Sequence, residues 1–218
     1  MDEYTDKLDQ EAKEYGERIR GAAARMDQMI QELLSYSRLT LMEFQMQPIR
    51  LSRLVKDAVA QIEWELEQKN ATLNIKRSQH QVLGNYAVLA QVVTNLLTNA
   101  LKFVASETVP MITIRDELKG DFVRVWVEDN GIGIAPEHQE RIFRIFERLH
   151  GRESYSGTGI GLAIVEKAIS RMNGRVGVES ELGNGSRFWF ELPLCAPPGN
   201  ESLLAEDLDE RSSVSKEG

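Results

Sequence analysis

Residues 123 to 134 constrain the fold more than any other part of the chain. Valine stands at every second position from 123 to 127, which predicts a strand that enters a packed sheet. The strand leads directly into Asp129-Asn130-Gly131, a turn sequence. We therefore expect a carboxylate at the end of a central strand, beside a glycine turn.

This turn has the chemistry of an adenine-binding site. Gly131 and Gly133 let the backbone approach a flat or charged ligand without interference from a Cβ atom. Asp129 can accept a hydrogen bond from an exocyclic amine, while Ile132 and Ile134 cover the ring. The alternative is a plain hairpin turn, which this tripeptide taken alone would more often be.

A helix predicted over residues 86–105 carries a polar face. Asn95, Asn99 and Lys102 are three and four residues apart, so they share one side of the helix. Asparagine is a poor helix former, and two on one face suggest a polar role such as holding a hydrated Mg²⁺ through oxygen ligands. The alternative is a solvated helix face.

A second glycine-rich run, Gly157-Thr158-Gly159-Ile160-Gly161, opens an amphipathic helix predicted over residues 160–173. Backbone N–H groups at a helix N-terminus suit a phosphate group. A dinucleotide-binding fold would need glycine where Leu162 stands, and a P-loop would need Gly-Lys-Ser/Thr, which the sequence lacks.

Four motifs resemble, in their order along the chain, the N box, first glycine box, F box and second glycine box of sensor histidine kinases. These kinases belong to the GHKL superfamily, with gyrase-type topoisomerases and mismatch-repair ATPases. The resemblance covers residues 1–194, and the run from 148 to 155 resembles phytochrome-like and related kinases. The motifs span residues 95–103, 125–134, 143–148 and 157–162, and residues 183–188 resemble a last glycine box.

The resemblance implies ATP and Mg²⁺ as cofactors. Asn99 would be the metal ligand, with Asn95 assisting, and Lys102 would reach phosphate oxygens. Phe103 would cover the adenine. Arg148 would contact phosphate from an ATP lid over residues 135–157, with Arg152 less certain. The remaining nucleotide-binding residues would be Asp129, Gly131, Gly133, Ile134, Gly157, Thr158, Gly159, Gly161 and Leu162.

The N-terminal region, residues 1–41, contains one long helix predicted over 5–41. Apolar residues recur at alternating spacings of four and three, which is a heptad pattern. A lone helix cannot bury these side chains, so the helix needs a partner surface. A coiled-coil arm or a helix folded onto the main domain would explain it. The resemblance implies the second helix of a dimerisation hairpin, which forms a four-helix bundle in a homodimeric parent. The stripe comprises Leu8, Ala12, Tyr15, Ile19, Ala22, Met26, Met29, Leu33 and Tyr36.

The resemblance implies an α/β two-layer sandwich of the GHKL type, a mixed sheet with helices on one face, over residues 51–194. Residues 42–50 form a connector, Ser52 is expected to cap a helix that runs to Lys69, and residues 195–218 form an acidic disordered tail. A helical piece is expected over residues 136–146, with Phe143 and Phe146 pinning the lid. The other expected strands are 49–51, 72–75, 82–84, 111–115, 122–128, 175–180 and 186–192.

Composition narrows the class of protein. The net charge of −8 argues against nucleic-acid binding, and the single cysteine excludes an internal disulfide. No apolar run approaches membrane-spanning length, so we expect a cytoplasmic domain without membrane contact.

These features predict a histidine kinase catalytic domain, whose partners would be the dimerisation domain of the same kinase and a response regulator. The alternatives are a non-catalytic ATP-binding regulatory module, a GHKL ATPase and a coiled-coil adaptor with a globular cap. ATPase members tend to carry a glutamate base where Asn95 stands, which favours the kinase.

The resemblance to sensor kinases implies an acceptor histidine on a helix, followed by an acid and, a few residues on, by a proline. His80, His138 and His150 are followed by glutamine, glutamine and glycine. We therefore expect this chain to bind Mg·ATP without phosphorylating itself.

Overall fold

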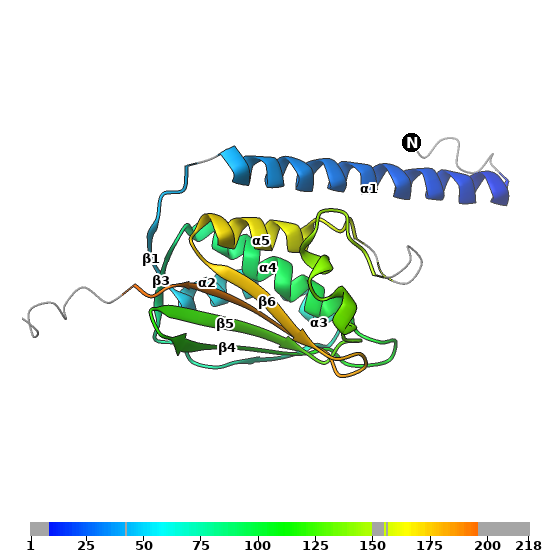
Figure 1. Cartoon of the computed structure of the whole chain (residues 1–218). Helices are drawn as coiled ribbons and strands as arrows, with labels where there is room; N and C mark the ends of the chain where they lie inside the picture. The colour runs from blue at the N-terminus through cyan, green and yellow to red at the C-terminus, as the bar shows by residue number, and fades with distance from the viewer. Residues whose placement is uncertain (1–8, 42, 150–154, 156, 196–218) are drawn as a thin grey trace, which may run out of the picture.

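Figure 1 shows the computed structural model, which describes residues 9–41, 43–149, 155 and 157–195. Five strands form one mixed sheet in the order β2-β4-β5-β7-β6, in which only the pair β2–β4 is parallel. A separate antiparallel pair joins β1 to β3. The strands are β1 Gln47–Arg50, β2 Thr72–Ile75, β3 Gln81–Gly84, β4 Met111–Lys119, β5 Phe122–Asp129, β6 Arg175–Ser180 and β7 Ser186–Pro193.

A layer of helices covers one face of this sheet, and α1 runs along the outer side of that layer (Figure 1). The predicted two-layer sandwich with one long N-terminal helix is therefore confirmed. The helices are α1 Gln10–Leu41, α2 Leu51–Ala60, α3 Glu63–Gln68, α4 Tyr86–Lys102 and α5 Gly161–Arg171, with 3-10 turns η2 Pro136–His138 and η3 Arg141–Phe143.

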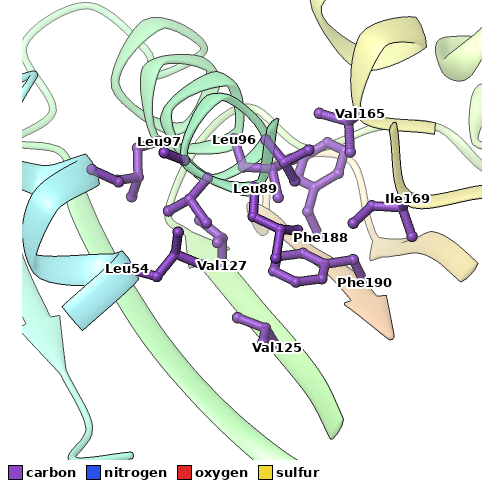
Figure 2. Close-up of a cluster of buried hydrophobic side chains, with 14 of the residues drawn as sticks. Leu54, Leu89, Leu96, Leu97, Val125, Val127, Val165, Ile169, Phe188 and Phe190 are labelled. Atoms are coloured by element: carbon purple, nitrogen blue, oxygen red, sulfur yellow. The ribbon is translucent and has the colours of Figure 1, made fainter. Parts of the chain in front are cut away.

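The core lies between the sheet and the helices. Leu96 and Leu97 of α4 face Val127 and Phe190 of the sheet, and Ile169 of α5 closes the cluster (Figure 2). All five side chains are almost completely buried. This packing fixes the ends of α4, β5 and α5 relative to one another.

The predicted helix over 52–69 is wrong in its start and in its continuity. Arg50 is still paired with Gln81 when α2 begins at Leu51, and the Leu51 N–H donates to the His80 carbonyl. A neighbouring backbone group therefore replaces the cap expected from Ser52. The helix also breaks at Ile62, which leaves helical geometry (φ −119°, ψ 16°) with its side chain buried in the core.

The heptad helix is confirmed as one continuous element from Gln10, while Leu8 lies outside the described residues. Its stripe stays largely open, since Ile19 is 69% and Met26 63% exposed. Among the residues that the structure describes, no helix has the length and hydropathy of a membrane span.

The end of the fold lies slightly beyond the predicted boundary. Leu194 forms an isolated bridge with Val82, and the Cys195 N–H donates to the Gln81 carbonyl. The rest of the predicted tail, residues 196–218, lies outside the described residues.

Candidate nucleotide-binding site

A cavity of about 390 Å³ opens where α4, the end of β5 and the start of α5 meet. Among the residues that the structure describes, it is lined by every predicted site residue except Gly131, while Arg152 lies outside them. Segments that are distant in the sequence converge here because the core in Figure 2 holds their elements together. The lining residues from the prediction are Asn95, Asn99, Lys102, Phe103, Asp129, Gly133, Ile134, Arg148, Gly157, Thr158, Gly159, Gly161 and Leu162.

Asp129, the last residue of β5, lines the cavity. Its Oδ1 accepts hydrogen bonds from the backbone N–H groups of Gly131 (2.8 Å) and Ser186 (3.1 Å). Both bonds end on Oδ1, which leaves Oδ2 to accept a bond from a ligand. Burial raises the pKa of Asp129 to about 6, although the two backbone bonds act in the opposite direction.

Packing within the protein also requires the glycines of this turn. A Cβ atom on Gly131 would lie 2.3 Å from the Phe103 carbonyl oxygen, and one on Gly133 would lie 1.9 Å from that of Glu181. Gly133 also has a φ of +70°. These glycines therefore let the turn pack against the neighbouring backbone, and Gly131 itself does not line the cavity.

The polar face of α4 points into the cavity. Asn95 Nδ2 donates to the Gly161 carbonyl at 3.2 Å, so its side-chain oxygen remains available to a metal or to water. Asn99 lines the same wall. Lys102 Nζ lies 4.4 Å from the centre of the Phe103 ring. Burial, and then the charge of Arg148, lower the pKa of Lys102.

The second glycine run forms the wall at the N-terminus of α5. The Thr158 hydroxyl accepts a hydrogen bond from the Ile160 N–H at 3.3 Å. A Cβ atom on Gly159 would lie 2.8 Å from the Glu147 carbonyl oxygen, whereas one on Gly161 would meet nothing within 4 Å. Gly161 is also helical. Neither packing against other elements nor backbone conformation therefore requires glycine at position 161.

The segment predicted as a lid differs from expectation in its helix and at Phe146. The helix expected over 136–146 is reduced to η2 and η3, because Gln139 is tied to the carbonyls of Ile134 (3.2 Å) and Ser180 (2.7 Å). Phe143 packs against the core as predicted, but Phe146 is 59% exposed with a φ of +65°, so it does not pin the segment.

Arg148 lines the cavity, but its guanidinium donates to the carbonyls of Gly157 and Tyr155, the latter at 2.9 Å. These hydrogen bonds tie Arg148 to its own segment in this structure. Arg152 and His150 lie outside the described residues.

Sequence reasoning missed a contribution from α1. Gln28 and Glu32 line the cavity, and Glu32 contacts Thr158. The heptad pattern assigned only the apolar stripe of α1, so it carried no signal for a polar residue that faces the main domain.

Comparison with known proteins decides the family. The profile of "Histidine kinase-, DNA gyrase B-, and HSP90-like ATPase" matches residues 84–196, just over half of the 218-residue chain. The chain belongs to this ATPase family. Within this family, the similar proteins below indicate the ATP-binding catalytic domain of sensor histidine kinases.

Two curated relatives are similar over 88% of this chain. One is the phytochrome-like protein Cph1 of Synechocystis sp., 35% identical over 25% of its length. The other is the uncharacterized sensor-like histidine kinase ycf26 of Porphyra purpurea, 34% identical over 32% of its length. The chain thus spans a quarter to a third of the length of these relatives.

Solved structures agree with the fold. Full-length ShkA in complex with AMPPNP is 28% identical, with a TM-score of 0.69 over 88% of this chain and 41% of that one. The nucleotide-free catalytic domain of histidine kinase ThkA is also 28% identical, with a TM-score of 0.58 over 70% of this chain and 96% of that one.

Proposed function

We propose that the cavity binds Mg·ATP, with adenine at the Asp129 end and phosphates between Lys102 and the N-terminus of α5. The observation that carries this proposal is that one cavity is lined by a half-buried carboxylate, Asp129, and by a half-buried cation, Lys102, which lies against Gly157 of the glycine run that leads into α5. Gly161 supports phosphate binding at the N-terminus of α5. A Cβ atom at this position would meet no atom of another element within 4 Å, so a glycine here leaves room for a ligand.

The side chains of α4 fit a magnesium ion. Mg²⁺ prefers oxygen ligands and retains water, and Asn99 and Asn95 offer amide oxygens on one wall of the cavity. Asn99 would be the direct ligand, and Asn95 would assist while its amide nitrogen holds Gly161. When bound, the ion would neutralise charge on the phosphates.

We further propose that the domain transfers the γ-phosphate of ATP to a histidine on the dimerisation domain of the same kinase, for relay to a response regulator in the cytoplasm. Its contribution would be positioning and charge neutralisation by Lys102 and Arg148. The relatives with sensor kinase names support this reading. The exposed stripe of α1 supports a homodimeric parent, because such a stripe can be buried against partner helices.

The histidines of this chain do not resemble phosphate acceptors. His80 contacts Asp116, and His138 belongs to the 3-10 turn η2 rather than to α1. His150 lies outside the described residues. We therefore propose that an acceptor must be supplied to this chain.

The test is incubation with γ-labelled ATP, with and without a dimerisation domain that carries an acceptor histidine. Acid-labile, base-stable label on the supplied domain alone is the expected result. Such label on this chain by itself would contradict the proposed acceptor. Release of inorganic phosphate without transfer would instead favour an ATPase, and nucleotide binding without either product would favour a regulatory module.

A further inference from the structure

Glu32 of α1 places a carboxylate in the wall of the cavity, beside Thr158. Its Oε2 accepts a hydrogen bond from the hydroxyl of Thr158, which is only 7% exposed. Its Oε1 accepts a 2.8 Å hydrogen bond from Gln28 Nε2, one helical turn earlier. Both carboxylate oxygens are therefore held, and both residues of α1 line the cavity.

The surroundings of Glu32 are those of an anion site. Thr158 precedes the N-terminus of α5, whose dipole favours negative charge. Lys102 is close enough for the Glu32 charge to offset part of the lowering of its pKa. Of the other carboxylates among the described lining residues, Asp129 accepts from the N–H groups of Gly131 and Ser186, and Glu147 forms a 2.7 Å ion pair with Arg141.

The C-terminal half of α1 is docked on the domain, which keeps Glu32 in this position. Leu39 is 4% exposed, and Arg171 of α5 donates to its carbonyl at 3.2 Å. Gln91 of α4 donates to the Ser35 hydroxyl at 3.2 Å. Nearer the N-terminus, Ile19 is 69% exposed, so α1 is held mainly at one end.

We propose that Glu32 is a specificity-determining residue that opposes nucleotide phosphates, so that docked α1 lowers affinity in proportion to the number of phosphates. This inference rests on the proposed function, because it assumes that phosphates bind at Thr158 and Lys102. Nucleotide binding and docking of α1 then oppose each other, and linkage makes the effect reciprocal. A displacement of α1 would in this way raise the affinity of the site for ATP.

The test compares the affinities of adenosine, ADP and ATP for the wild type, Glu32→Gln and Asp27→Asn. Glutamine keeps one oxygen that can accept from Thr158 and loses only the acceptor for Gln28 Nε2, an exposed bond within α1, so this variant removes the charge and keeps the contact between α1 and Thr158. Asp27 is exposed on the same helix and does not line the cavity, which makes it a matched control for net charge. We expect Glu32→Gln to bind ATP roughly three- to tenfold more tightly, ADP with a smaller gain and adenosine unchanged. Asp27→Asn should match the wild type.

A second measurement follows α1 directly. Amide hydrogen exchange over residues 30–41 should become faster when ATP saturates the wild type, and it should not change with adenosine.

The outcomes separate this inference from the function on which it rests. ATP binding by the wild type that is unchanged in Glu32→Gln overturns the inference alone. An equal gain for adenosine also overturns it, because the effect would then not depend on phosphate charge. Absence of ATP binding in every variant overturns the proposed function and the inference together.

Discussion

Asp129 Oδ1 accepts a 2.8 Å hydrogen bond from the backbone N–H of Gly131, two residues further along the chain. One oxygen of the carboxylate thus shapes the turn, while the other remains for a ligand. A mutation can therefore separate the role of Asp129 in the turn from its role in ligand binding.

Asp129→Asn should weaken adenine nucleotide binding about ten- to a hundredfold, since the charged acceptor is lost. Thermal stability should not fall by more than about 1 kcal/mol, because the amide oxygen can still accept from Gly131 and Ser186. Calorimetric titration and thermal unfolding measure the two effects. Asp121→Asn, at the exposed hairpin turn, is the control. A large loss of stability with normal affinity would show that Asp129 is only a turn residue.

The pKa of Asp129 gives this site a pH dependence. Since burial raises that pKa from 3.8 to about 6, the folded chain holds a proton that the unfolded chain has lost between these values. The contribution of Asp129 to the free energy of unfolding should therefore fall as pH rises from about 4 to about 6, and stay constant above. Asp129→Asn should lack this component.

Adenosine affinity should show the opposite trend, rising with pH through about 6 as the carboxylate forms. Adenosine is the right probe because it carries no titrating phosphate. Its dissociation constant should be measured from pH 5 to 7.5 in the wild type and in Asp129→Asn. The same pH profile in both would rule out Asp129 as the titrating group.

Features of the fold that depend on local sequence patterns could be predicted, whereas features that depend on contacts between distant elements could not. The alternating strand, the polar face at Asn95, Asn99 and Lys102, and the order of the motifs are local patterns, and they located most of the cavity. The break at Ile62 and the backbone cap at Leu51 depend on neighbouring elements, which no local pattern records. No sequence pattern indicated Glu32, because its contact with Thr158 forms only when α1 docks on the domain beside α5.

The glycines of the site should divide into two classes. Gly133→Ala should destabilise the domain by about 1–3 kcal/mol, because residue 133 has a φ of +70° and its Cβ would lie 1.9 Å from a backbone oxygen. Gly161→Ala should fold normally, with stability unchanged or raised by up to about 1 kcal/mol, yet should bind ATP more weakly. Urea unfolding and nucleotide titration distinguish the classes. Normal ATP affinity in Gly161→Ala would remove the argument that this glycine makes room for phosphate.

The last prediction concerns the metal. Asn99 lies on the cavity wall and offers an amide oxygen, so Asn99→Ala should lose the Mg²⁺-dependent part of ATP affinity, roughly tenfold or about 1.4 kcal/mol. ATP dissociation constants should be measured with excess Mg²⁺ and with a chelator for each variant. Asn74→Ala, exposed on β2, is the matched control and should retain the full Mg²⁺ effect. With the chelator, Asn99→Ala and the wild type should bind ATP alike, because the side chain would then have no ion to hold. An equal Mg²⁺ dependence in Asn99→Ala and the wild type would show that the ion is held elsewhere.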